Sequence, residues 1–268
     1  MVVVSAFKDG SDALRANPVL LVAGLLVGIG SQLQYVGRLI DSPILSTGVS
    51  LAWLVVFPFV LGGFIGTARA AIEGTNASLT GFFAAAATHY RALLGGTVAF
   101  VLLVFGTAVG LGLAGFVFGI GAMALATVNE VVAFAVGVGS AVIWLVSILV
   151  VMFVQFYDTA IVIENKSVTE SLRRSIDLVR SNPKSVAGFS VVWVALLNAF
   201  LVPEYLLQVT LTDASPVDVV PIDPGLPIAV LLPIGITLSA IGFAYLYTVY
   251  TAYYMRLTAT SPAPVESI

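Results

Sequence analysis

ILSTGVSLAWLVVFPFVLGGFIGTA, the stretch from Ile44 to Ala68, contains no charged side chain and only a few polar ones. A membrane-crossing α-helix needs about 20 mostly apolar residues, because the hydrocarbon core of a bilayer is about 30 Å thick. This stretch is long enough to meet that requirement, and Arg69 and Glu73 mark its end. We therefore predict a transmembrane helix here.

Five further stretches of the chain have a comparable apolar character. The third and fourth are separated only by Asn129 and Glu130, so each of these two helices can exceed the thickness of a bilayer. The six expected spans are 18–37, 44–68, one that begins near residue 92, one that ends near residue 157, 185–211 and 226–256. The sequence thus predicts an all-α, polytopic membrane protein with six transmembrane helices.

The composition supports a membrane protein and excludes several classes of site. Of the 268 residues, 59% are apolar and 9% are charged, whereas soluble domains have about 25% charged residues. Cysteine is absent and histidine occurs once, which excludes disulfides, thiolate chemistry and His-rich metal sites. The net charge of −3 argues against a nucleic-acid partner. We expect no cofactor and no enzymatic activity, with membrane lipids and other membrane proteins as partners.

The basic residues predict the orientation of the chain. Ten of the eleven Lys and Arg residues lie before an odd-numbered span or after an even-numbered one, and Arg38 is the exception. Because cytoplasmic loops retain basic residues, we expect a multi-pass protein of the cell membrane with both termini in the cytoplasm. Five tyrosines crowd the inner end of the sixth span, where we expect an aromatic belt, namely Tyr245, Tyr247, Tyr250, Tyr253 and Tyr254.

A Thr-Ala pair recurs at the cytoplasmic ends of the even-numbered spans. The pairs begin at Thr67, Thr159 and Thr251, which are 92 residues apart in both cases. We interpret the chain as one membrane domain, 1–268, built from three hairpins, each preceded by a cytoplasmic interfacial helix. The expected internal repeats cover 1–76, 77–165 and 166–260, and their hairpins should superpose around an axis near the membrane normal.

The segment 167–182 is the best-defined of the expected interfacial helices. Ser167 and Glu170 have the spacing of a capping box, and apolar residues recur along one face of the segment. Its arginines are candidates for contact with anionic lipid headgroups, namely Arg173, Arg174 and Arg180. The simpler alternative, which we favour, is a positively charged anchor that also fixes the angle of the following hairpin.

Few polar side chains fall within the expected spans, and each is costly to bury in hydrocarbon unless it is paired or hydrated. The candidates are Asn198 near mid-membrane, Glu204 towards the outer interface, and Gln155 and Asp158 near the inner end of the fourth span. For Asn198 and Gln155 we favour hydrogen bonds between helices over a functional role.

Two segments carry a resemblance to a known family. FPFVLGGFIGTARAAIEG (57–74) and VQFYDTAIVIENKSVTESLRRSIDLVRSN (154–182) resemble an uncharacterised family of haloarchaeal six-helix membrane proteins. That family is similar to the membrane domain of some glycerophosphoryl diester phosphodiesterases, in which a separate soluble domain performs the hydrolysis. The resemblance therefore implies a halophilic source and a membrane fold, and it implies no catalytic residue.

Two classes of function fit the sequence. We favour a non-catalytic scaffold or assembly factor of the cell envelope that contacts lipid headgroups, because no catalytic constellation stands at a recognisable spacing. The alternative is a transporter or channel for a small or lipidic solute, suggested by prolines inside the spans and by Asn198 and Glu204. A continuous wet path that reaches Asn198 would favour transport, and a tightly packed bundle would favour the scaffold.

Overall fold

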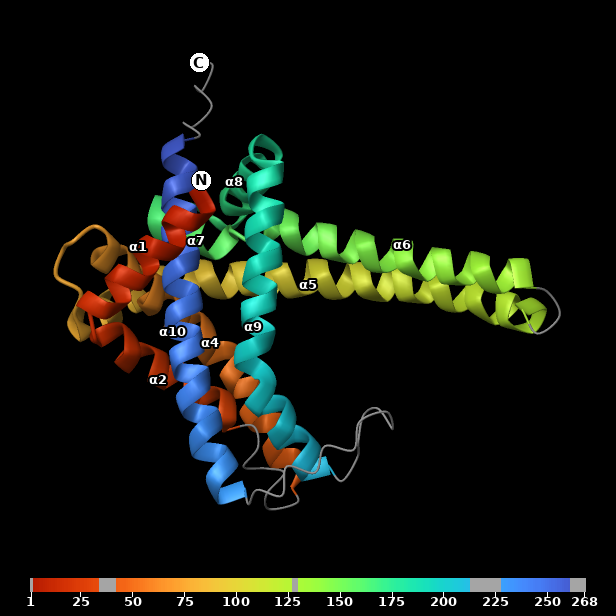
Figure 1. Cartoon of the computed structure of the whole chain (residues 1–268), viewed down its shortest axis with the longest axis horizontal. Helices are drawn as coiled ribbons and strands as arrows, with labels where there is room; N and C mark the ends of the chain where they lie inside the picture. Colours follow the sequence, from red (N-terminus) through yellow and green to blue (C-terminus); the bar gives the residue numbers. More distant parts are fainter. Residues whose placement is uncertain (1, 34–41, 127–129, 213–227, 261–268) are drawn as a thin grey trace.

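The computed structural model describes residues 2–33, 42–126, 130–212 and 228–260, and these ranges are helical without a strand (Figure 1). The helices are α1 (Val2–Ala16), α2 (Val19–Gln32), α4 (Pro43–Ile72), α5 (Leu79–Ala126), α6 (Glu130–Val154), α7 (Tyr157–Glu164), α8 (Val168–Ser181), α9 (Pro183–Thr212) and α10 (Ile228–Thr260). The all-α prediction is confirmed.

Within the described ranges, five helical stretches are long and apolar enough to cross a membrane. They are Pro43–Ile72, Leu79–Thr107, Leu145–Glu164, Pro183–Val202 and Leu232–Thr260. The expected spans 44–68, 185–211 and 226–256 agree closely with α4, α9 and α10. Long apolar runs determine these helices because every backbone polar group must be hydrogen-bonded within the segment when water is absent.

The first expected span, 18–37, differs in part from the structure. Helix α2 has 14 residues, or about 21 Å, which is shorter than a hydrocarbon core. Helices α1 and α2 are together long and apolar enough to form one span, which is bent by 96° near Pro18. The end of the expected span, 34–37, and Arg38 lie outside the described residues.

Helix α5 is one continuous element of 48 residues, or about 72 Å. The separate interfacial helix that we expected before the third span is therefore not present, because α5 is unbroken from Leu79 onwards. The described side chains of α5 that are buried lie in its first half, at Phe82, Ala86, Leu93, Gly96 and Thr97, and the remainder of the helix runs beside α6.

The α5–α6 hairpin runs across α9 and α10 (Figure 1), whereas the repeat predicts three hairpins aligned with one another. Its distal half extends away from the other helices, and the contacts that fix it to them come from the first half of α5 and the end of α6. Only one half of the hairpin packs against the other helices. These tertiary contacts, and not the repeat in the sequence, therefore set the direction in which the hairpin runs.

The fourth expected span is broken near its inner end. Helix α6 ends at Val154 and α7 begins at Tyr157, so backbone groups on both sides of the break lose their helical partners. The buried Ser175 on α8 provides replacements: its hydroxyl accepts the N–H of Phe156 (3.0 Å) and donates to the carbonyl of Phe153 (2.8 Å). The break between α6 and α7 and the packing of α8 against it therefore depend on each other.

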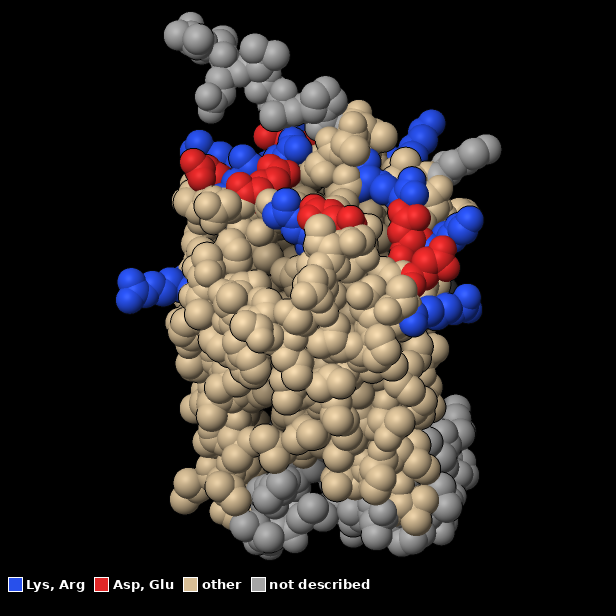
Figure 2. Space-filling view, turned by 90° about the vertical axis from the view of Figure 1, so that its left-hand side faces the viewer, with Lys and Arg blue, Asp and Glu red and all other residues tan. Residues whose placement is uncertain are grey.

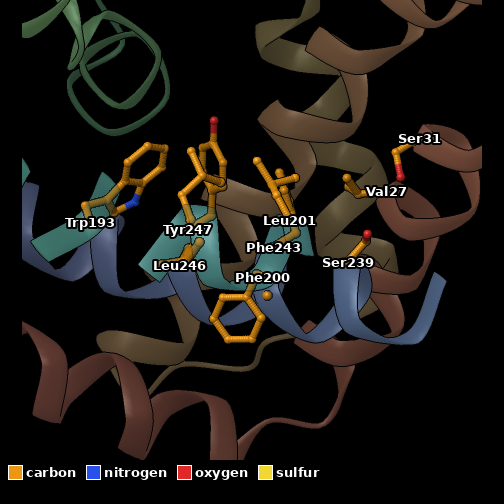
Figure 3. Close-up of a pocket in the computed structure, with 11 residues that line it drawn as sticks. Val27, Ser31, Trp193, Phe200, Leu201, Ser239, Phe243, Leu246 and Tyr247 are labelled. Carbon is orange, nitrogen blue, oxygen red and sulfur yellow. The ribbon is translucent and has the colours of Figure 1, made fainter. Parts of the chain in front are cut away.

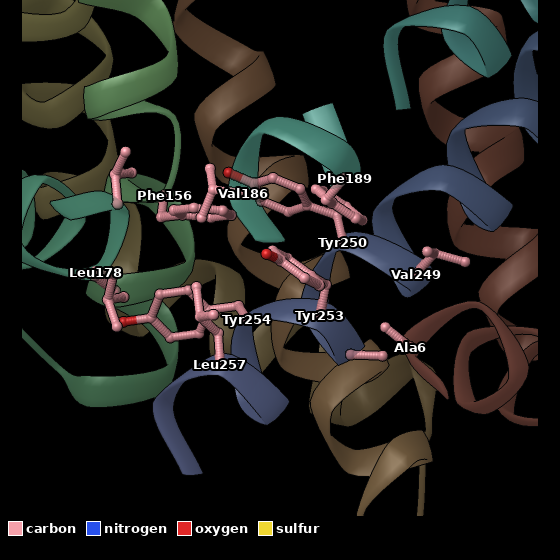
Figure 4. Close-up of a cluster of buried hydrophobic side chains, with 13 residues drawn as sticks. Ala6, Phe156, Leu178, Val186, Phe189, Val249, Tyr250, Tyr253, Tyr254 and Leu257 are labelled. Atoms are coloured by element: carbon pink, nitrogen blue, oxygen red, sulfur yellow. The ribbon is translucent and has the colours of Figure 1, made fainter. Parts of the chain in front are cut away.

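The core surrounds the C-terminal half of α10. Tyr253 and Tyr254 are fully buried, and Tyr253 stacks on Phe189 of α9 with ring centroids 3.9 Å apart (Figure 4). Phe156, at the break before α7, stacks on Tyr250. The expectation of an aromatic belt is therefore wrong for Tyr250, Tyr253 and Tyr254, which pack against α7, α8 and α9 instead of facing lipid.

The three recurring Thr-Ala pairs share burial and one pattern of hydrogen bonding. Thr67, Thr159 and Thr251 are buried, and each hydroxyl donates to a carbonyl of the preceding turn or helix break, over 2.8, 3.0 and 2.7 Å. The pairs lie on α4, α7 and α10, which pack around one another. Small size and an internally satisfied hydroxyl allow this close packing.

Candidate functional site

A cavity of about 600 Å³ lies where the α5–α6 hairpin meets α4, α7, α9 and α10. Its volume is within the range of about 300–1,000 Å³ that is usual for small-molecule sites. Most of its lining is aliphatic and aromatic, including Phe57 of α4, Phe100 of α5 and Met152 of α6. Its polar side chains gather at one end, apart from Ser147 of α6.

Asp158 is the central polar group of that end. Asp158 is 4% exposed. Its Oδ1 accepts hydrogen bonds from the N–H of Thr159 (2.7 Å) and from the hydroxyl of Tyr250 (3.4 Å). The single hydrogen of the Tyr250 hydroxyl is shared with the backbone carbonyl of Gln155, which lies closer to the hydroxyl than Asp158 does. These contacts place a carboxyl group in the cavity wall, six residues, or about 9 Å along the helix, from Glu164.

Two further pairs of polar side chains complete the polar end. Gln155, in the break between α6 and α7, and Ser190 of α9 hydrogen-bond each other at 3.2 and 3.3 Å. Thr97 of α5 and Tyr157 of α7 lie 3.2 Å apart through their hydroxyl oxygens. The polar end therefore combines side chains from four helices, α5, α7, α9 and α10, and from the break between α6 and α7, which fixes their positions relative to one another.

The exposure of the lining residues shows where the cavity opens. On α4, Leu61 is buried and Leu54, two turns away, is exposed; on α5, Thr97 is buried and Val101 is exposed. Exposure also rises from the half-buried Gln155, just after α6, to the exposed Val151, and on α9 from the half-buried Ser190 to the exposed Val194. The polar end is thus the closed end, and the mouth lies among apolar side chains on the outer surface.

A second cavity, of about 160 Å³, adjoins the first (Figure 3). Trp193 and Tyr247 line both cavities, and their rings meet edge to face with centroids 6.5 Å apart. In the part of the chain that is described, the buried Nε1–H of Trp193 has no hydrogen-bond partner. A buried donor without a partner costs about 1–3 kcal/mol, so this position favours a ligand or water that carries an acceptor.

The structure brings together two of the four intramembrane residues that the sequence predicted. Gln155 and Asp158 both line the large cavity, and the predicted hydrogen bond between helices is present for Gln155. Asn198 is exposed and donates to the carbonyl of Val194 on its own helix (2.8 Å), so the prediction of a bond between helices is wrong for this residue. Glu204 lies in α9, and its side chain is outside the described part of the structure.

Charged side chains gather at one end of the molecule (Figure 2), the end that holds α8 and the final turns of α10 (Figure 1). Glu164 is central there: it accepts the hydroxyl of Tyr254 (2.6 Å), pairs with Arg174 (3.0 Å) and lies 3.6 Å from Lys166. A second ion pair joins Arg256 to Asp9. These contacts link α1, α7, α8 and α10 at their charged ends.

The three candidate arginines of α8 differ in their surroundings. The side chain of Arg174 is 11% exposed and forms an ion pair with Glu164, whereas Arg173 and Arg180 are exposed. The predicted capping box is confirmed: Glu170 accepts the backbone N–H and the hydroxyl of Ser167, over 2.9 and 2.7 Å. These hydrogen bonds to the charged form lower the pKa of Glu170.

Sequence reasoning missed several residues of the cavity, above all Tyr250, Ser190 and Trp193. Tyr250 follows Asp158 by 92 residues, which is the interval of the Thr-Ala pairs, so the repeat held a signal for this contact. No comparable signal connects Ser190 or Trp193 to α6. Among the described residues, no group of three His, Asp or Glu side chains is placed to hold a metal ion.

Comparison with known proteins gives a family and no activity. A family model described as a domain of unknown function (DUF7847) matches residues 1–257. No curated protein and no solved structure matches the chain.

Proposed function

The chain belongs to the DUF7847 family, and we propose that it is a non-catalytic integral membrane protein that contacts lipid headgroups as a scaffold or assembly factor of the cell envelope. The observation that carries this proposal is the charged end of the molecule, where α8 holds its apolar side against α6 and α7 and presents Arg173 and Arg180 outward. An amphipathic helix with basic residues on its outer face suits the interface of a membrane.

The proposed topology has six spans and both termini in the cytoplasm. It is supported by the position of α1 and of the last turns of α10 at the charged end, together with the excess of Lys and Arg there. In a bilayer this topology requires the distal half of the α5–α6 hairpin, beyond the part that packs on the other helices, to align more closely with α9 and α10 than it does in Figure 1.

Cysteine labelling tests the topology, because the chain has no cysteine of its own. Ile44, at the start of α4, is 87% exposed and should lie outside, whereas Arg180 should lie in the cytoplasm. We expect Ile44→Cys to react with an impermeant maleimide added to intact cells, and Arg180→Cys to react only in inverted vesicles. The opposite pattern would reverse the topology, and labelling of both from one side would contradict six spans.

Headgroup contact is tested by the double variant Arg173→Gln/Arg180→Gln in nanodiscs that contain anionic and zwitterionic lipid. Each basic residue near an anionic surface contributes about 1 kcal/mol, so the preference for anionic lipid should fall roughly 30-fold at low salt. At molar salt, where the Debye length is about 3 Å, the loss should be small. Arg174→Gln is the control: it should lower stability through Glu164 and change lipid preference less.

Equal lipid preference of the double variant and the unmodified protein at low salt would contradict headgroup contact. Loss of folding at high salt would instead assign these arginines a structural role.

A transporter of a lipidic solute is the second candidate, and the large cavity is the observation that favours it. Asn198 does not belong to the described lining, so the wet path through Asn198 that would have supported a channel gains no support. Movement of a fluorescent lipid between the leaflets of proteoliposomes, compared with protein-free liposomes, tests this candidate directly.

A further inference from the structure

We infer that the large cavity is a binding site for one uncharged, hydroxyl-bearing amphiphile of the monoglyceride type, with its head at Asp158 and its chain leaving through the apolar mouth. This inference is independent of headgroup contact at α8, because none of the α8 arginines lines the cavity.

The orientation of the ligand follows from the distribution of polar groups. Asp158, Gln155 and Ser190 lie at the closed end, whereas Leu54, Val101 and Val194 lie at the exposed end. A polar head in the closed end meets several hydrogen-bonding groups, and a hydrocarbon chain at the mouth meets apolar side chains apart from the half-buried Ser147 of α6. The reverse orientation would place the head against hydrocarbon, at the cost of its hydration.

The charge of the lining selects the class of head. Among the described lining residues Asp158 is acidic and none is basic, so a phosphate or carboxylate head would meet a carboxyl group without a compensating cation. A glycerol head suits this end better, because its hydroxyls can donate to the Asp158 carboxyl and its oxygens can accept hydrogen bonds.

Trp193 provides a second, independent observation that points to a ligand. Its buried Nε1–H has no partner among the described residues, and the ring belongs to the wall between the two cavities. Buried donors in native proteins are nearly always paired with protein or with bound molecules. An ester or hydroxyl oxygen of the ligand would satisfy this donor in the same region as the Asp158 end.

The source of the ligand is the surrounding membrane. The mouth consists of side chains that are exposed on helices long and apolar enough to span a bilayer, at Leu54 of α4, Val101 of α5 and Val194 of α9. An amphiphile can therefore enter sideways from the lipid phase with its chain still in hydrocarbon. The closed end lies about 9 Å along the helix from the charged Glu164, which is a shallow depth suited to a glycerol group.

Photo-crosslinking in nanodiscs tests the inference with two probes that share one acyl chain. The first is a monoglyceride with a diazirine in its chain, and the second carries a phosphate in place of the glycerol head. We expect saturable labelling by the monoglyceride within residues 147–158 and 186–198, competed by monoolein. The phosphate probe should label these peptides about tenfold less, as expected for an unpaired charge.

A matched pair of double variants separates the cavity from the general lipid surface. Val151→Phe/Val194→Phe narrows the mouth and should reduce labelling roughly tenfold. Val146→Phe/Val192→Phe adds the same bulk to the same two helices outside the described lining, and Val146 and Val151 are both 37% exposed. The second variant should label like the unmodified protein.

Asp158→Asn tests the head directly and should abolish the preference for glycerol over phosphate. If this variant does not fold, the phenylalanine pair still decides the question. Labelling that monoolein does not compete, or that is equal in the two double variants, would overturn the inference. Equal labelling by the phosphate probe would overturn the assignment of the head.

Discussion

Replacement of Ser175 by alanine should destabilise the protein by about 1–3 kcal/mol, because it leaves a buried backbone N–H without an acceptor. The Ser175 hydroxyl accepts the N–H of Phe156 at 3.0 Å and donates to the carbonyl of Phe153 at 2.8 Å. Ser175 and Phe156 are both fully buried, so water cannot replace the hydroxyl without rearrangement. The cost should appear as a lower free energy of unfolding in an SDS titration in mixed micelles.

Ser171→Ala is the matched control for this prediction. Ser171 lies one turn earlier on α8 and is equally buried, but its hydroxyl donates to the carbonyl of Val168 within the first turn of the same helix (2.7 Å). Its loss leaves no donor unpaired, and alanine favours the helix, so the change should be within about 0.5 kcal/mol. Equal destabilisation by the two variants would refute the view that Ser175 satisfies the break between α6 and α7.

Two further outcomes follow from the helix packing and from the cap of α8. A methyl group at Gly24 would lie 2.5 Å from the carbonyl oxygen of Ala240. Gly24→Ala should therefore destabilise the contact of α2 with α10 by more than about 1 kcal/mol. Gly48 has no neighbouring atom within 4 Å of such a methyl group, so Gly48→Ala should not lower stability in the same titration. The lowered pKa of Glu170 means that its stabilisation of α8 is fully present above the ordinary value of 4.5 and is lost as the pH falls through the lowered value. Hydrogen exchange of the first turn of α8 should show this acid-dependent loss in the unmodified protein and not in Glu170→Gln.

Local sequence patterns predicted the features that depend on neighbouring residues. The capping box at Ser167 and Glu170 is a contact over three positions, and the long apolar runs of α4, α9 and α10 need no partner to be recognised. Gln155 and Asp158 were identified because polar side chains are rare in such runs. Each of these features depends on residues that lie close together in the sequence.

Other features depended on which helices meet, and the sequence alone could not decide them. Tyr253 and Tyr254 are of the residue type that is typical of an interfacial belt, yet they are buried because α8 and α9 pack over the C-terminal half of α10. Arg174 has the same local pattern as Arg173, yet only Arg174 faces Glu164. Tertiary contacts remove these side chains from lipid or water, and nothing in their immediate neighbours predicts that.

The sequence by itself determined that this is an all-helical chain for a membrane, because only helices satisfy the backbone of long apolar runs in hydrocarbon. The tertiary structure alone decided that α6 breaks before Tyr157, that α5 and α6 run across α9 and α10, and that a cavity forms at their junction. Lipid and helix surfaces are equally apolar, so hydrophobicity does not specify which helices pack together. Close contacts of small residues and a few polar pairs, such as Tyr250 with Asp158, make that choice.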